Sequence, residues 1–145
     1  MNILQVVISV FLLLEVLNIL VLYRKPSMKE GNGLGIFKVL DDIEPGNQVH
    51  HLIRYLTNWI ANAKFIFVAL GIVVIIFGDE VVQFHAALAL AFSIMMFYFT
   101  LYPILKKLDE EGQLAVRGYS KTLAYTILSF FLTFIAGIVI YLIQR

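Results

Sequence analysis

The chain has 145 residues, of which 61% are hydrophobic and 14% are charged, and its formal net charge is +1. Soluble domains are typically about 45–50% apolar and about 25% charged, so this is the composition of a membrane protein. The near-neutral charge gives no argument for binding nucleic acid. Because cysteine is absent, disulfides, thiolate metal sites and cysteine nucleophiles are excluded. We expect one all-α integral membrane domain, 1–145, with four transmembrane helices.

The first predicted crossing, 3–23, is an apolar run long enough to span a bilayer. A cleaved signal peptide is not expected, because no basic residue precedes the run and Arg24 and Lys25 follow it in place of a small-residue cleavage site. Glu15 interrupts the run. A carboxylate near the centre of a membrane helix costs roughly 2.5–3.5 kcal/mol on insertion scales, so Glu15 is the first candidate for a functional residue.

The first connection, 24–60, begins with a loop whose glycine-rich stretch, 31–35, predicts a flexible connector. Residues 36–43 place apolar side chains at helical spacing with charged side chains between them. This pattern predicts a short amphipathic helix at the membrane surface, ended by Pro45.

Three further crossings are predicted by the remaining apolar stretches. From Asn47 the helical spacing continues into the second crossing without a breaker, so this helix exceeds the roughly 30 Å hydrocarbon core. The predicted crossings are 61–78, 81–103 (ended by Pro103) and 122–143, with a second connection at 104–121, in which the acids 109–111 are expected to be solvated. Four such helices in up-down order form an antiparallel bundle by default.

Basic residues are concentrated in the two longer connections. Ten of the eleven Lys and Arg residues lie in or beside 24–60 and 104–121, and only Arg145 lies on the other side. The positive-inside rule therefore predicts that both connections are cytoplasmic and both termini outside. The expected location is the plasma (inner) membrane.

Small residues at four-residue spacing predict the faces by which the helices pack in lipid. The third crossing has Ala87 and Ala91, and the fourth has Ser129, Thr133 and Gly137. We expect these residues to face the interior of the bundle.

Four polar residues are candidates for a transport or ion site: Glu15, Asn18, Lys64 and His85. Asn18 follows Glu15 by three residues and lies on a nearby face of the same helix. An intramembrane carboxylate can change its charge when an ion arrives. Alternatively, Glu15 pairs with Lys64 and holds two helices together. His85 is either an outer proton group or an interfacial histidine bonded to a neighbouring helix.

The sequence contains no motif of a hydrolase, protease, kinase or phosphatidyltransferase. His50 and His51 are adjacent and point about 100° apart on a helix, so they are poor joint metal ligands, and we expect neither a metal nor a cofactor.

The favoured function is that of a non-catalytic membrane protein: an accessory or assembly subunit, or a homo-oligomeric component. Its expected partners are the lipid bilayer, a second copy or a larger membrane complex, and a cytoplasmic protein at residues 35–44. The alternative is a proton- or cation-coupled small transporter or channel that uses Glu15. A membrane enzyme or redox carrier is the least favoured class.

Overall fold

The computed structural model describes residues 2–29, 34–44 and 46–144, and within these ranges the chain is helical with no β-strand. The elements are α1 (Ile3–Arg24), η1 (Leu34–Ile36), η2 (Lys38–Leu40), α2 (Gln48–Phe77), α3 (Glu80–Thr100), α4 (Tyr102–Glu110) and α5 (Tyr119–Gln144). Four helical stretches among the described residues are long and apolar enough to cross a membrane, with α3 and α4 counted together. The prediction of an all-helical chain with four such stretches is confirmed.

The helix ends follow from capping side chains in the sequence. Asn2 caps α1 in a reciprocal capping box, because its side chain accepts from the Gln5 amide while the Gln5 side chain accepts from the Asn2 amide. Asn47 accepts from the Val49 amide at the start of α2. Asp79 accepts from the Val82 amide and starts α3 directly after the turn that ends α2.

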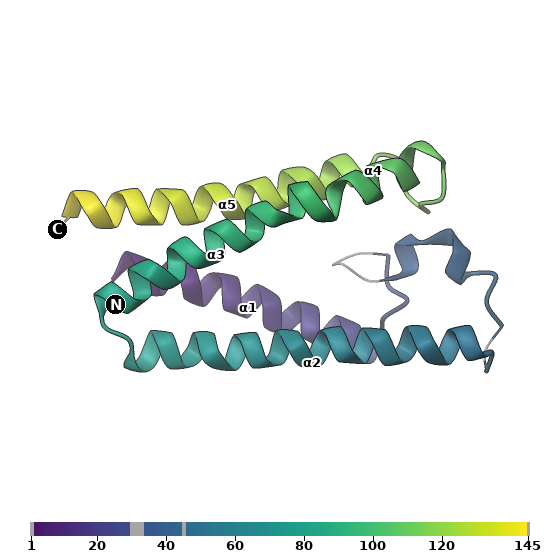
Figure 1. Cartoon of the computed structure of the whole chain (residues 1–145), viewed down its shortest axis with the longest axis horizontal. Helices are drawn as coiled ribbons and strands as arrows, with labels where there is room; N and C mark the ends of the chain where they lie inside the picture. Colours follow the sequence, from purple (N-terminus) through teal and green to yellow (C-terminus); the bar gives the residue numbers. More distant parts are fainter. Residues whose placement is uncertain (1, 30–33, 45, 145) are drawn as a thin grey trace.

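Figure 1 shows how the helices lie: α2 runs along one edge of the molecule, α5 along the opposite edge, and α1 and α3 lie between them. The closest neighbours are α1 with α2 and α3 with α5, and α1 also packs against α5. Beyond their common turn, α2 and α3 diverge (Figure 1). The connection 111–118 and the described parts of the connection between α1 and α2, 25–29, 34–44 and 46–47, lie at the far end of the molecule (Figure 1). The start of α1 and the end of α5 lie at the end where α2 turns into α3 (Figure 1).

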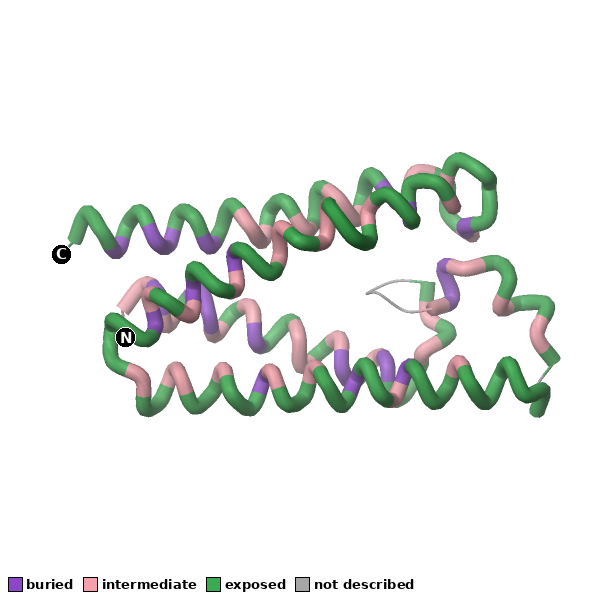
Figure 2. Tube along the Cα trace, viewed as in Figure 1, coloured by how far each residue is buried: buried purple, intermediate pink, exposed green. Residues whose placement is uncertain are grey.

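The core is built around α1, whose buried residues cluster with buried residues of α2, α3 and α5. Figure 2 marks the buried residues along each helix. Phe11 of α1 is partly buried and packs against this core. The Phe11 ring meets Phe67 of α2 and Phe130 and Phe134 of α5 edge to face, with centroids 5.3–6.1 Å apart.

Two glycines let the neighbouring helices approach α1 closely. A Cβ atom on Gly71 of α2 would lie 2.7 Å from the Leu12 side chain, and one on Gly137 of α5 would lie 2.9 Å from the Val7 side chain. Both distances are shorter than van der Waals contact. Helices in lipid associate through close packing of this kind, so Gly71 and Gly137 determine how α2 and α5 sit on α1.

The residues of the predicted packing stripes lie on the buried face of α3, but they are divided between the buried and exposed faces of α5. Ala87 and Ala91 are buried, as is Gly137, whereas Ser129 and Thr133 lie on the exposed face of α5 and hydrogen-bond to carbonyl groups of their own helix. Each four-residue step turns about 40° further round a helix. Gly137, two such steps after Ser129, therefore lies about 80° further round α5. The buried face of α5 is on the side of Gly137, so Ser129 lies outside it.

The expected amphipathic helix at 36–43 is not confirmed. The segment forms the two single turns η1 and η2, separated by Phe37 in an extended conformation (φ −91°, ψ 112°). Phe37 makes an isolated antiparallel bridge with Leu114 of the other connection. The Ala115 amide donates to the Ile36 carbonyl (2.8 Å), and this pairing replaces helical hydrogen bonds. The predicted stop at Pro45 and the glycines at 31 and 33 lie outside the described residues.

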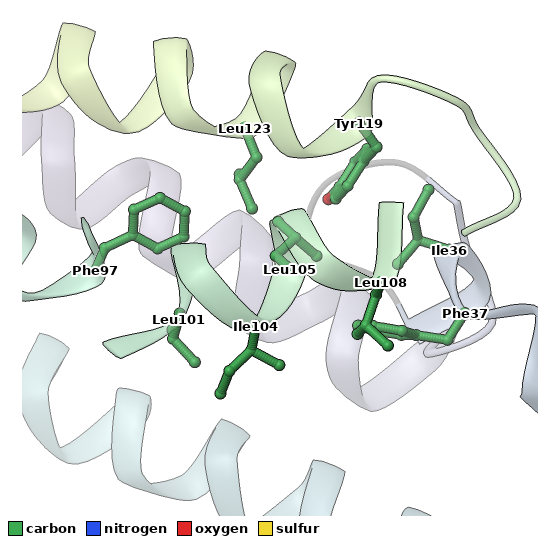
Figure 3. Close-up of a pocket in the computed structure, with 9 residues that line it drawn as sticks. All are labelled: Ile36, Phe37, Phe97, Leu101, Ile104, Leu105, Leu108, Tyr119 and Leu123. Carbon is green, nitrogen blue, oxygen red and sulfur yellow. The ribbon is translucent and has the colours of Figure 1, made fainter. Parts of the chain in front are cut away.

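Two apolar side chains of this segment, Ile36 and Phe37, pack on protein, whereas Val39 is exposed. Ile36 is buried with Leu105 and Leu114. Ile36 and Phe37 also form one wall of an apolar cavity of about 220 Å³ whose other walls come from α3, α4 and α5 (Figure 3). The two connections are therefore docked onto each other at one end of the molecule.

The third long stretch continues past the expected stop. α3 ends at Thr100, and Pro103 lies in the first turn of α4, where its missing N–H has no helical partner to lose. The charged residues after it lie largely in α4.

Candidate functional site

The candidate site is an ion pair between the two helices that pack most closely. Lys64 Nζ of α2 donates to Glu15 Oε2 of α1. The two helices lie antiparallel, and a hydrogen bond on either side of the pair holds their register: Gln5 Nε2 donates to the Ile75 carbonyl (3.2 Å), and the Tyr23 hydroxyl donates to Asn62 Oδ1. The structure therefore brings together two of the four predicted site residues.

The ion pair is half-buried. The Lys64 and Glu15 side chains are 29% and 19% exposed, and both face an open groove of about 460 Å³ between α1, α2 and α3. Apart from the pair, the groove is lined by apolar and small side chains: Phe11, Trp59, Ile60, Ala63, Phe67, Leu90, Ser93 and Ile94. Each charge is compensated by the other, so α1 carries its carboxylate without an isolated charge in apolar surroundings.

Asn18 lies on α1 one turn after Glu15 and is half-buried. It is the polar residue nearest to the ion pair along the same helix.

His85 does not join this site. Its side chain is exposed, and its Nδ1 lies 2.8 Å from the Val81 carbonyl oxygen of its own helix, so its hydrogen bond does not reach a neighbouring helix. His85 lies near the turn between α2 and α3, at the end of the molecule where Gln5 contacts α2. Glu15 is ten residues further along α1 than Gln5, or about 15 Å at 1.5 Å per residue.

His50 and His51 are both exposed on α2, with ring centroids 6.1 Å apart. Within the described ranges, no three His, Cys, Asp or Glu side chains converge as metal ligands.

A second polar cluster, at the turn between α2 and α3, was not predicted. Asn2 Nδ2 donates to Gln83 Oε1 (2.8 Å), and Gln83 Nε2 donates to the Gly78 carbonyl (2.8 Å). The Gln83 side chain is buried and uses both ends of its amide. The spacing of Asn2 and Gln5 is a capping signature, a local signal from which the start of α1 could have been predicted. The hydrogen-bond partner of Asn2, Gln83, lies 81 residues away in the sequence, so this contact could be identified only from the tertiary structure.

Asp109 of α4 differs from the solvated acid that was expected. Its carboxylate accepts from the amides of Gly118 and Ser120 (both 2.9 Å) and from the Ser120 hydroxyl (2.6 Å). These contacts satisfy amides at the start of α5, so Asp109 caps that helix from another element. Asp109 lies beyond the predicted crossing 81–103. The hydrogen bond from the Ser120 hydroxyl holds the pKa of the Asp109 carboxyl below its usual value, although burial alone would raise this pKa. Glu110 and Glu111 are exposed, as expected.

Comparison of the chain with family models, with curated proteins and with solved structures finds no match. The four long apolar helices in the described part of the chain are those of a multi-pass helical membrane protein. Within that class, this chain joins α1 to α2 and α3 through polar contacts and leaves an open groove beside its one interhelical ion pair among the described residues.

Proposed function

We propose that this protein is a non-catalytic membrane component, an accessory or assembly subunit or a homo-oligomer, that receives a transmembrane helix in the groove beside Glu15 and Lys64. In this proposal the four long helices form an up-down antiparallel bundle. The observation that carries it is the groove of about 460 Å³, which the divergence of α2 from α3 leaves open along the bundle.

Small residues on the groove walls favour a helix as its occupant. Ala63 of α2 and Ser93 of α3 both line the groove and are both exposed. Small side chains let helix backbones approach closely in lipid, where close packing and interhelical hydrogen bonds drive association. The Glu15–Lys64 pair supplies polar atoms at the same level, to which a side chain of an incoming helix can hydrogen-bond.

The proposed topology has the two connections in the cytoplasm, both termini outside and the plasma (inner) membrane as the location. It is supported by the clustering of Lys and Arg residues in connections that lie at one end of the molecule (Figure 1). A cytoplasmic partner at 35–44 would meet Val39 and the acids Asp41, Asp42 and Glu44, which are exposed.

Site-directed crosslinking tests the groove as a helix interface. The chain has no cysteine, so Ser93→Cys introduces a unique attachment point for a photoactivatable maleimide. Illumination in native membranes should produce a discrete adduct with a second copy or another membrane protein. Ser129→Cys, exposed on α5 away from the groove, is the matched control. An adduct only from the control, or only lipid adducts at position 93 together with a monomer in native mass spectrometry, would overturn the proposal.

The alternative function is a proton- or cation-coupled transporter or channel that uses Glu15. The observation in its favour is that the Glu15 carboxylate lines the open groove. In proteoliposomes, Glu15→Gln would then abolish proton or cation flux while circular dichroism shows an unchanged helix content. Absence of flux from the unaltered protein, or equal flux from both proteins, would rule this function out.

A further inference from the structure

A second cavity, of about 360 Å³, lies where α4 meets the start of α5, outside the groove. Three basic side chains line it: Lys106 of α4, Arg117 of the connection and Lys121 of α5. We propose that Lys106, Arg117 and Lys121 form a binding site for the phosphate of an anionic membrane lipid.

The carboxylates of the cavity are largely committed to other contacts. Asp109 accepts three hydrogen bonds from Gly118 and Ser120, and Glu110 pairs with Lys106 at 3.7 Å. Arg117 has no ion pair within the described residues, and Lys121 interacts with Asp109 only at longer range. The five charged groups of the cavity carry a net charge of +1, and Arg117 and Lys121 have their charged ends available to an anion.

The cavity lies at the level of the helix ends, where a lipid headgroup would be. Tyr102 forms part of its wall. The Tyr102 ring meets that of Tyr98, with centroids 5.9 Å apart, and the Tyr98 hydroxyl donates to the Ala124 carbonyl of α5 (2.6 Å). Tyrosine is enriched at the boundary between hydrocarbon and headgroups. Basic pockets between transmembrane helices on the cytoplasmic side bind anionic headgroups, and this chemistry favours a lipid over free phosphate.

Native mass spectrometry of the whole chain in mild detergent tests the site. The probes are phosphatidylglycerol, phosphatidylcholine of the same acyl length, and inorganic phosphate. We expect retained phosphatidylglycerol adducts, and a weakening of their binding by about tenfold in the double variant Arg117→Gln with Lys121→Gln. Phosphatidylcholine and inorganic phosphate should bind at least severalfold more weakly than phosphatidylglycerol.

The matched control is Arg24→Gln with Lys25→Gln. It removes the same two charges from exposed positions at the end of α1, on the same side of the molecule. Equal loss of binding in both double variants, no loss in the first, or displacement of phosphatidylglycerol by millimolar phosphate would overturn the proposal. The single variant Lys121→Gln, at an exposed side chain, should show a smaller loss and keeps the test decisive if the double variant does not fold.

Discussion

The Glu15 carboxylate of α1 and the Lys64 ammonium of α2 form an ion pair between the two most closely packed helices. Hydrogen bonds from Gln5 and Tyr23 to α2, on either side of the pair, hold the same register. The pair thus places opposite charges at one level of α1 and α2 and lets an apolar helix carry a carboxylate.

Breaking this pair from one side should destabilise the protein more than exchanging its two charges. Removal of one partner of a buried pair costs about 3–5 kcal/mol, and the partial exposure here reduces the expected effect of Glu15→Gln or Lys64→Met to about 1–3 kcal/mol. The charge exchange Glu15→Lys with Lys64→Glu should recover much of that loss. Unfolding in mixed detergent measures the unfolding free energy of the two single variants and of the charge-exchanged protein. Additive losses in the exchanged protein would show that the pair does not couple α1 to α2.

Enlarging Gly137 should separate α5 from α1. A Cβ atom there would lie 2.9 Å from the Val7 side chain, so Gly137→Leu overpacks this contact and should cost about 1–3 kcal/mol in unfolding free energy. Val7→Ala in the same chain should restore part of the loss. Thr133→Leu, on the exposed face one turn earlier, is the control and should change stability by less than about 0.5 kcal/mol. A larger effect at Thr133 than at Gly137 would contradict the packing described.

Gln83→Leu should loosen the start of α1. The substitution leaves Asn2 Nδ2 and the Gly78 carbonyl without their side-chain partner, at a cost of about 1–3 kcal/mol. Hydrogen exchange of the first-turn amides of α1 should become faster, while amides in the middle of α5 keep their protection. The exposed His85→Leu two residues later should leave exchange in α1 unchanged. Equally faster hydrogen exchange in both variants would show that the hydrogen bonds of Gln83 do not specifically hold the start of α1 in place.

Asp109→Asn should remove an acid-sensitive contribution to the stability of the second connection. The pKa of the Asp109 carboxyl is lowered in the folded protein, so its stabilising effect is fully present above the unfolded value of about 3.8 and is lost as pH falls through the lower folded value. Loss of such a helix cap typically costs about 0.5–2 kcal/mol. Hydrogen exchange of the Gly118 and Ser120 amides, followed from pH 6 down to pH 3, measures this effect. The exposed Glu110→Gln is the control. Acid sensitivity that persists in Asp109→Asn would assign it to another group.

Apolar run lengths and breakers in the sequence were sufficient to predict an all-helical chain with four long apolar helices, and the pattern from Asn47 predicted the overlong α2 that starts at Gln48. These features depend only on the order of residues along the chain, because a membrane crossing requires only enough consecutive apolar residues. The positions of Asn47 and Asp79 as helix caps are equally local.

For most of the helices, only the tertiary structure decided which side faces inward, although Ala87 and Ala91 had already indicated the inner face of α3. In water, the apolar face of a helix marks the core, but in lipid both faces are apolar and the pattern carries little information about rotation. Rotation is instead determined by contacts such as those of Gly71 and Gly137 on α1. That rotation turned Glu15 towards Lys64 and left Ser129 and Thr133 outside, because the partners that decide each orientation come from distant parts of the chain.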